Sequence, residues 1–377
     1  MHVVHVIANN SSVPYLTWFA ERLGEYPDVK FTFIVMYPEQ PRMVDEMKKY
    51  GCDAYWIKFN EARRKSGMVF AFFKLYKLFK KLKPDVINAH LFDDSVPALL
   101  AARLAGIKKR VIRKQETAYH WYFAPKWVWV DRFNNFNSTD IIAISKGSEQ
   151  FLIEKEKAPL EKVHMIYNGI PIKHFTAQVD TDKEFLIKKY GLEDKIVLGT
   201  ISRYIEWKGY RYIIEAARTL VQKYKNLKFL FVGYGEQQQE LEQMVHEYGL
   251  SDFIIFSGWI DRKYIPSLYG VMDLYVHAAI MEPFGFVLVE AMANGVPIVT
   301  SKTGVAADAL EHQVTCYFTG DKDPQGIANG VEWMIDNPEK RETMKEKIKK
   351  IAAEQFNIEY MLEEHIKVYR GEKKIIF

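Results

Sequence analysis

Short β-branched runs alternate regularly with longer stretches of helical character along this chain, and this alternation limits the folds that the chain can adopt. Such alternation is typical of βα units, in which parallel strands form a sheet that helices cover on both faces. Helices are predicted between the strands, for example at Tyr15–Leu23 and at Val96–Ala105. The strands predicted in the first half are Val3–Ala8, Phe31–Met36, Ala54–Ile57, Val86–Ala89, Arg110–Arg113 and Ile141–Ile144.

The same pattern starts again in the second half, after a polar stretch from His174 to about Asp182 that we interpret as a linker. A length of 377 residues also favours two domains over one. We therefore predict two Rossmann-like, doubly wound α/β domains, 1–172 and 173–357, which face each other across a cleft, with a C-terminal helix at about 358–377 packing back on the first. The strands predicted in the second half are Ile196–Ile201, Phe229–Val232, Phe253–Phe256, Leu274–His277 and Pro297–Thr300.

Composition narrows the class of protein further. The formal net charge of +4 falls short of the basic field of a nucleic-acid-binding protein. The two cysteines, Cys52 and Cys316, match no metal or redox spacing, so we expect buried free thiols. The N-terminus enters a strand without a basic leader, and no apolar run is long enough to span a bilayer. We expect a cytoplasmic protein.

The loop after the strand Ile196–Ile201 carries Arg203 and Lys208, five residues apart. Ligands of doubly wound sheets bind beyond the carboxyl ends of the strands, which is where these two cations lie. Together they could neutralise a diphosphate, because arginine can bind two oxygens at once. A solvated loop with ordinary surface charges is the alternative.

A second, weaker pattern follows the strand Phe229–Val232, where Gly233 and Gly235 form a Gly-x-Gly sequence. Glycines at this place allow close approach of the backbone to a phosphate or a base. The third glycine and the acidic residue of a dinucleotide fingerprint are absent.

The strongest pattern runs from Glu282 to Glu290, with Pro283 at the predicted first helical position and Gly295 just past the end of one helix. Gly285 in the first turn would leave backbone N–H groups open to a ligand, and a helix N-terminus attracts anions. Glu290 interrupts an otherwise apolar helix, where a carboxylate is costly unless it is hydrogen-bonded. Ribose hydroxyls would satisfy Glu290, and Glu282 at the helix mouth suits sugar hydroxyls. The alternative is a structural helix whose buried glutamate is paired with a protein donor.

This run, with seven residues between Glu282 and Glu290, resembles the hallmark of the retaining glycosyltransferases of family 4. These are enzymes of the GT-B type, with two Rossmann-like domains, and are also called glycosyl transferases group 1. The likeness extends from about Ile196 to Lys322. Asn168-Gly169-Ile170 is similar to the family's crossing between its domains.

The resemblance implies a role for each residue of the donor site. Arg203 and Lys208 would hold the diphosphate, Glu290 the nucleotide ribose and Glu282 the donor sugar. The other donor contacts would come from the backbone at Phe284, Gly285 and Phe286, from the glycine loop at Gly233, and from Trp259 and Ile260 beside the base.

The first domain departs from the family's pattern, because the loop after its first strand has no glycine. We expect Asn10 and Ser11 of that loop, and His90 at the end of another strand, to line the cleft or the acceptor site. Gln115 stands where relatives often carry a histidine and is assigned to the same group. His120 retains the second histidine of that pattern and is our catalytic candidate, together with Arg203, Lys208 and Glu282; a packed structural histidine is the alternative.

No metal is expected, and no cofactor beyond the nucleotide diphosphate sugar, which is a co-substrate. Asp-x-Asp strings, which hold a divalent ion in other glycosyltransferases, occur at Asp180–Asp182 and Asp321–Asp323. Neither string follows an apolar strand, and Arg203 and Lys208 would supply the same neutralisation.

The stretch from Ala62 to Pro84 contains eight lysines or arginines and no acid, interleaved with aromatic residues. A basic, aromatic helix can lie on anionic lipid and bring an enzyme to a lipid-linked acceptor. Peripheral contact with the inner face of the membrane through 63–83 is therefore one hypothesis. A helix that packs its apolar side on the sheet is the other.

These patterns predict a retaining hexosyltransferase that moves a sugar from a nucleotide diphosphate sugar to a saccharide or lipid-linked acceptor, in polysaccharide or glycolipid synthesis. Two alternatives stay open. A nucleotide-sugar epimerase of the same shape would need further carboxylates in the first domain, for which Asp93, Asp94 and Glu116 are candidates. A catalytically inactive relative that only binds a nucleotide sugar fits the departures in the first domain.

Overall fold

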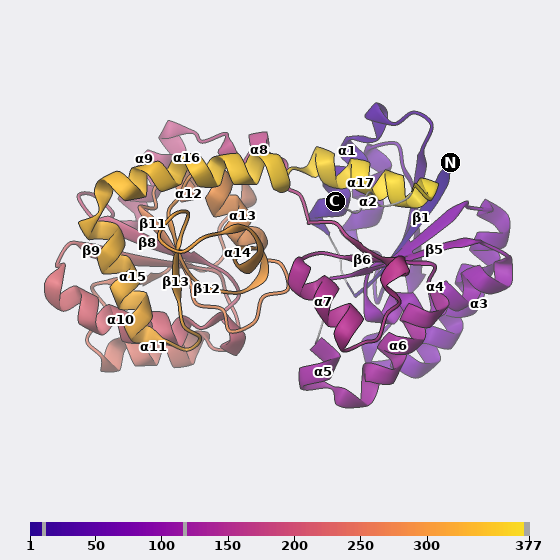
Figure 1. Ribbon diagram of the computed structural model, residues 1–377, viewed down its shortest axis with the longest axis horizontal. Coiled ribbons are helices and arrows are strands. Elements are labelled where there is room, and N and C mark those ends of the chain that lie inside the picture. The colour runs from indigo at the N-terminus through magenta and orange to yellow at the C-terminus, as the bar shows by residue number, and fades with distance from the viewer. Residues whose placement is uncertain (10–12, 116–118, 373–377) are drawn as a thin grey trace. The chain divides into compact units, whose positions relative to one another are not determined.

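A computed structural model of the chain describes residues 1–9, 13–115 and 119–372, and the chain divides into two compact units (Figure 1). Unit 1 contains Met1–Gly169 together with Ile358–Phe377, and unit 2 contains Ile170–Asn357. The chain therefore leaves unit 1 after Gly169, a few residues before the boundary predicted at 172/173, and returns to it at Ile358.

The sheet of unit 1 has seven parallel strands in the order β3-β2-β1-β4-β5-β6-β7. Its central strands are almost wholly buried, which explains why they read as continuous apolar runs in the sequence. Connections from β1 lead to β2 on one side, and those from β4 lead to β5 on the other, so the switch point lies between β1 and β4. The strands are β1 (His2–Ala8), β2 (Lys30–Tyr37), β3 (Asp53–Lys58), β4 (Val86–Ala89), β5 (Lys109–Lys114), β6 (Asp140–Ala143) and β7 (Val163–Met165).

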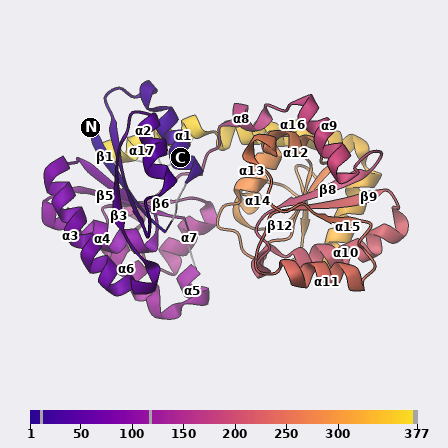
Figure 2. The same cartoon turned by 180° about the vertical axis from the view of Figure 1, so that it is seen from behind.

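Helices cover both faces of this sheet, as Figures 1 and 2 show. On one face α3, α4 and α6 pack against one another, and on the other α1 packs against α2 and against α17 from the far end of the sequence. The helices of unit 1 are α1 (Pro14–Glu21), α2 (Arg42–Lys49), α3 (Arg64–Leu82), α4 (Phe92–Ala105), α5 (Tyr119–Phe123), α6 (Val128–Asn137), α7 (Lys146–Glu154) and α17 (Ile358–Arg370).

The sheet of unit 2 has six parallel strands in the order β10-β9-β8-β11-β12-β13. It repeats the doubly wound pattern, with its switch point between β8 and β11. The strands are β8 (Ile196–Ile201), β9 (Leu227–Val232), β10 (Ile254–Phe256), β11 (Leu274–His277), β12 (Ile298–Ser301) and β13 (Tyr317–Thr319).

The polar stretch that we interpreted as a linker is instead largely helical and belongs to unit 2, since it contains the end of α8 and the start of α9. These helices pack on α12 and α13, whereas α10 packs with α11 and α15. The helices of unit 2 are α8 (Ile172–Thr176), α9 (Asp180–Tyr190), α10 (Tyr210–Lys223), α11 (Gln238–Glu247), α12 (Ile265–Gly270), α13 (Phe286–Ala293), α14 (Gly304–Ala309), α15 (Pro324–Asp336) and α16 (Pro338–Gln355).

The prediction of two Rossmann-like α/β domains is confirmed, and each unit has its own buried apolar core. Cys52 and Cys316 are free and buried, as expected. The edge strands β7 and β13, of three residues each, were not predicted. None of the helices in the described ranges is both long and apolar enough to cross a membrane.

Candidate active site

The loops that follow β8 and β11 form the candidate donor site of unit 2. The chain turns from β8 toward β9 and from β11 toward β12, in opposite directions, so these two loops diverge at the switch point and leave room for a ligand. Arg203 and Lys208 lie on the first loop, and the segment from Glu282 to Gly285 lies on the second. The topology thus brings together residues that are more than seventy positions apart in the sequence.

Lys208 and Glu282 meet directly. The Nζ of Lys208 donates a hydrogen bond to Oε2 of Glu282, and both side chains are largely buried. Nε2 of His277, the last residue of β11, lies 3.6 Å from the same oxygen. An ammonium carries three N–H donors, so its bond with Glu282 leaves Lys208 able to contact phosphate oxygens as well.

The electrostatics of this cluster fix the charge of Glu282. Burial by itself would raise the pKa of Glu282, but His277 and the ammonium of Lys208 outweigh it and lower that pKa to about 2. Burial also lowers the pKa of His277, against the pull of Glu282, so the imidazole is neutral. The cluster is therefore an ion pair between Lys208 and Glu282 beside a neutral histidine.

The helix of the strongest sequence pattern starts later than predicted. α13 begins at Phe286 with Gly285 as its N-cap, so Pro283 lies outside the helix. Gly285 has φ +96, a conformation that favours glycine, and a Cβ there would lie 3.0 Å from Leu288 and 3.2 Å from Cγ of Glu282. Glycine at this position therefore lets the Glu282 side chain pack close against the start of the helix.

Glu290 is paired within the protein. The hydroxyl of Tyr269, from α12, donates to Oε2 of Glu290 at 2.9 Å. Burial raises the pKa of Glu290 to about 7, although Tyr269 and the charge of Arg262 lower it. The alternative of a protein donor for Glu290 is thus realised for one carboxylate oxygen, and a ribose contact stays a prediction for the other.

The remaining donor candidates follow neighbouring strands at the same edge of the sheet. Arg203 is exposed, and its guanidinium has no hydrogen bond or ion pair among the residues that the structure describes. A Cβ on Gly233 (φ +145) would lie 2.0 Å from the carbonyl oxygen of Ser202, so this glycine lets the β9 loop lie against the β8 loop. After β10, Ile260 is buried, whereas Trp259 is 67% exposed and available for stacking.

The backbone carbonyl of Phe284 accepts a hydrogen bond from the N–H of Val305 at 2.8 Å. The ring of Phe284 is buried between Phe286 and Phe356. These contacts hold the loop before α13 in place from both sides.

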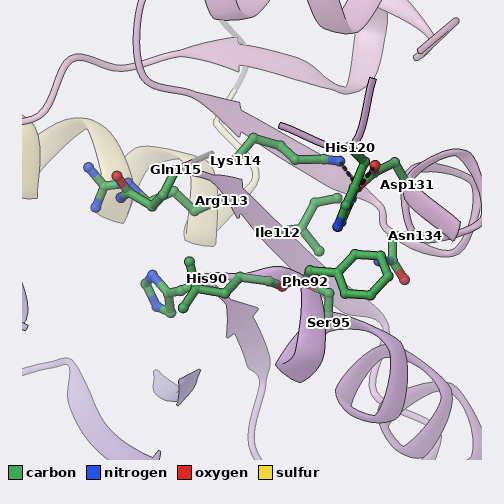
Figure 3. A pocket seen from close by; sticks show the side chains of 11 residues that line it. His90, Phe92, Ser95, Ile112, Arg113, Lys114, Gln115, His120, Asp131 and Asn134 are labelled. Carbon is green, nitrogen blue, oxygen red and sulfur yellow. Dashed lines mark hydrogen bonds and ion pairs between the residues drawn. The ribbon is translucent and has the colours of Figure 1, made fainter. Parts of the chain in front are cut away.

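In unit 1, three of the predicted residues line one pocket at the carboxyl ends of β4 and β5, namely His90, Gln115 and His120 (Figure 3). Arg113, Lys114 and Asp131 also line it. Asn10, Ser11 and Glu116 lie outside the described residues.

His120 lies on α5 and is oriented by α6. Its Nδ1 is 2.8 Å from Oδ2 of Asp131, and Oδ1 of Asp131 accepts a hydrogen bond from Lys114 at 3.1 Å. The ring of Phe92 packs edge-on against the imidazole at a centroid distance of 4.2 Å. Burial opposes ionisation of Asp131, yet its bonds with His120 and Lys114 lower its pKa, so Asp131 is a carboxylate that fixes the tautomer of His120.

His90 is held by the protein at both ring nitrogens. Nε2 lies 2.9 Å from Nδ1 of His5, and Nδ1 lies 2.6 Å from the hydroxyl of Tyr15. Burial, with the neighbouring His5 and Arg113, lowers the pKa of His90 well below its usual range. His90 therefore forms a wall of the pocket and does not reach a ligand through its nitrogens.

The two Asp-x-Asp strings lie at the starts of helices. Asp180 and Asp182 lie in the first turn of α9, and Asp323 caps α15 by accepting a hydrogen bond from the N–H of Gly326 at 2.8 Å. Within the described ranges, no three His, Cys, Asp or Glu side chains are grouped to hold a metal ion.

Each unit matches a family of glycosyltransferases. Residues 182–351 match the family described as Glycosyl transferases group 1, and residues 19–174 match the family described as Glycosyltransferase Family 4. Together the two matches support a GT-B glycosyltransferase of group 1.

The curated relatives of this chain are distant in sequence. It is 27% identical over 244 residues to an uncharacterised glycosyltransferase of Methanocaldococcus jannaschii and 24% identical over 242 residues to the α-D-kanosaminyltransferase of Streptomyces kanamyceticus. Both alignments span 64% of this chain, and they span 62% and 63% of those relatives' lengths. The capsular polysaccharide biosynthesis glycosyltransferase CapM of Staphylococcus aureus is 27% identical over 315 residues, 78% of this chain and 79% of CapM.

Solved GT-B structures share the fold of this chain. HepE of Anabaena in complex with UDP matches with a TM-score of 0.84 at 22% identity, covering 98% of this chain and 100% of HepE. HepE in complex with UDP-glucose matches with a TM-score of 0.83 at 22% identity, covering 98% of this chain and 99% of HepE. At this identity the likeness establishes the fold alone.

The sequence analysis missed several residues at the sites of the two units. His277 contacts Glu282, Tyr269 bonds Glu290 and Asp131 orients His120. His277 carried a signal, because it closes a predicted strand just before the Glu282 loop. Tyr269 and Asp131 carried none, since helix packing alone brings them to their partners.

Proposed function

We propose that this chain transfers a sugar from a nucleotide diphosphate sugar to an acceptor hydroxyl, with retention at the anomeric carbon. The observation that carries the proposal is the Lys208–Glu282 pair at the switch point of unit 2, at the N-terminus of α13. One loop supplies cations for a diphosphate, and the other supplies a carboxylate for sugar hydroxyls.

Departure of the nucleoside diphosphate is the main electrostatic step. Negative charge develops on the leaving oxygen, and Arg203, Lys208 and the first turn of α13 are placed to stabilise it. Fixed cations of this kind do the work that a divalent ion does elsewhere, so we propose a metal-independent reaction with no cofactor.

Retention is proposed from the resemblance to the retaining family, and it is consistent with a site in which neither Glu282 nor Glu290 is a free nucleophile. Glu282 is bonded by Lys208, and Glu290 is bonded by Tyr269. In the proposed step, the acceptor oxygen bonds the anomeric carbon on the face that the diphosphate leaves, and the departing phosphate oxygen takes the hydroxyl proton. Paired carboxylates on either side of the reacting carbon would indicate a hydrolase instead.

The first donor to test is UDP-glucose, because HepE, a protein of the same fold, binds it. Polysaccharide or glycolipid synthesis is proposed as the setting, in line with the resemblance to CapM. The test is incubation of the full chain with UDP- and GDP-sugars, with release of the nucleoside diphosphate and the anomeric configuration of the product measured by NMR. An inverted product would overturn retention, and absence of release with every donor and acceptor would overturn the transferase.

The carboxylates of unit 1 do not favour the epimerase alternative, because Asp93 and Asp94 are engaged in contacts within the fold. Asp93 is ion-paired with Arg64 at 2.9 Å. Asp94 accepts the backbone N–H groups of Ala8, His90 and Leu91. Both are therefore occupied in holding the start of α4. Isomerised donor without transfer would favour the epimerase, and tight donor binding without turnover would favour an inactive relative.

We also propose that α3 lies on anionic membrane. Ala71, Leu75 and Phe79 of this helix are buried against the sheet, so the helix does pack as the alternative reading held. Yet Val69 and Phe73 of the same helix are 60% and 58% exposed and lie among its lysines. A cytoplasmic enzyme with this surface would reach lipid-linked acceptors, and binding to vesicles tests the contact.

A further inference from the structure

The end of the unit 1 pocket nearest His90 contains a buried arginine. Arg113, at the end of β5, is 2% exposed. Its Nη2 donates to Oδ1 of Asn168 and lies 3.1 Å from Sδ of Met361, and its guanidinium carbon lies 4.5 Å from the centre of the Tyr15 ring. All of these neighbours are uncharged.

This cation has no carboxylate partner in the described parts of the chain. Its Nε and Nη1, and Nε2 of the neighbouring Gln115, make no well-formed hydrogen bond there, although the Tyr15 hydroxyl lies close to both side chains. The groups around it are the neutral rings of Tyr15, His5, His90 and His365. A buried charge is expensive unless it is paired, so three unused donors around one cation are an arrangement suited to an anion.

The unused donors belong to side chains that line the pocket. Arg113 and Gln115 lie together at one end, near His90, whereas Lys114 extends the opposite way to Asp131 and His120 (Figure 3). Successive residues at a strand end point to opposite sides, which explains this separation. At the His120 end, Lys114 is ion-paired with both Asp131 and Glu156, whereas among the described residues the Arg113 end carries a net positive charge.

We propose that the Arg113 end of this pocket binds an anionic group carried by the acceptor, a phosphate or a carboxylate, with Arg113 and Gln115 as its donors. The proposal rests on the proposed function, because it names the chemistry of the acceptor. The planar fork of a guanidinium matches two oxygens of such a group. Held there, the acceptor would present a hydroxyl to the end of the pocket where His120 lies.

The test is calorimetric binding of inorganic phosphate and of glucose 6-phosphate to the full chain in a phosphate-free buffer. Arg113→Met should weaken binding roughly 30-fold, because a charged hydrogen-bonded pair is lost. The matched control is Arg110→Met, on the same strand, whose guanidinium bonds backbone oxygens of Ile107 and Asn137 away from the pocket. It should bind both ligands like the wild type.

Phosphate could also bind at the proposed donor site, so the titrations are repeated in Lys208→Met, where the Arg113-dependent binding should persist. If Arg113→Met does not fold, Gln115→Leu serves instead, with an expected loss of roughly fivefold. Equal affinity of the wild type and the pocket variants, or no phosphate binding by the wild type, would overturn the proposal.

A lipid phosphate and a soluble phosphate share this chemistry, and a competition experiment distinguishes the two sources. Vesicles of phosphatidic acid that compete with glucose 6-phosphate at Arg113 would indicate a lipid source, and failure to compete would indicate a soluble one. UDP binding is measured in parallel. UDP binding without phosphate binding defeats this inference alone, whereas Arg113-dependent phosphate binding without any nucleotide binding or turnover defeats the proposed function alone.

Discussion

Lys208 is engaged by Glu282 in the absence of a donor, so the two should have opposite effects on diphosphate affinity. Lys208→Met removes a cation and should weaken UDP binding roughly 20-fold. Glu282→Gln removes the competing carboxylate and should tighten UDP binding about threefold, while lowering the transfer rate roughly 100-fold if Glu282 contacts the sugar. Isothermal titration with UDP and initial rates measure both.

The control for that pair is Lys223→Met, which removes an exposed lysine ion-paired with Glu332 on the surface of unit 2. It should bind UDP as the wild type does. If Lys208→Met and Lys223→Met bind UDP equally, Lys208 does not contact the diphosphate.

Glu290 should make the stability of the fold depend on pH. Its pKa is about 7 in the folded chain and near 4.5 when unfolded. Between these values the folded state binds more protons, so the free energy of unfolding falls as pH rises from about 4.5 to about 7 and then levels off. Relative to Glu290→Gln, the wild type should lose about 2 kcal/mol across that window.

Urea denaturation of wild type and Glu290→Gln at pH 5 and pH 8 measures this loss. Glu247→Gln, on the exposed side of α11, is the matched control and should leave the pH dependence of the wild type unchanged. A constant difference between wild type and Glu290→Gln at both pH values would contradict the assignment.

At the scale of elements, the packing of α5 against α6 positions His120 through Asp131. Asp131→Asn should lower the transfer rate by roughly tenfold or more, because the carboxylate that fixes the tautomer and orientation of His120 is lost. His120→Ala should cost roughly 100-fold. Steady-state rates from pH 5 to pH 9 measure these effects.

The matched control is a second histidine–aspartate pair of unit 1 that does not line the pocket. Asp140 binds His164 at 3.0 Å and Lys109 at 2.9 Å. Asp140→Asn should reduce stability without lowering the transfer rate of the folded enzyme. A rate loss of equal size in both variants would indicate that His120 acts only through the fold.

The exposed apolar side chains of α3 should bind anionic lipid. Phe70→Ser with Phe73→Ser should lower binding to phosphatidylglycerol vesicles at least tenfold, because two rings no longer enter the interface. Phe185→Ser, which removes a similarly exposed ring from unit 2, is the control and should bind normally. Sedimentation with vesicles at low and high salt measures this, and wild-type binding to phosphatidylcholine at the same level would count against an electrostatic contribution.

For the whole molecule, the proposed donor chemistry predicts no need for a divalent ion. Chelation with EDTA should leave the transfer rate within about twofold, since Arg203 and Lys208 neutralise the diphosphate. Rates with EDTA, and with EDTA followed by Mg²⁺ or Mn²⁺, test this. A loss of activity that either ion restores would show that the cations of the loop are insufficient.

Much of this architecture is visible in the sequence for a physical reason. Strands buried on both faces must be apolar, and the helices between them must stop and restart at polar turns, so eleven strands and most helices leave a local pattern. β7 and β13 did not, because His164 and Thr319 interrupt their three-residue apolar runs. β10 is equally short and also lies at an edge, but its residues are all apolar. The end of α8 and the start of α9 were misread as a linker since these turns are mostly polar.

The amino-acid sequence alone indicates the two doubly wound units and the donor segments Arg203–Lys208 and Glu282–Glu290, because both segments follow strands whose carboxyl ends form the edge where ligands bind. The groups that these residues contact depend on the tertiary structure. Lys208 contacts Glu282, Tyr269 contacts Glu290 and Asp131 contacts His120, and Arg113 is buried without a carboxylate among the residues that the structure describes. Local pattern reflects burial and backbone geometry, whereas charge pairing depends on which helices and loops pack together across the fold.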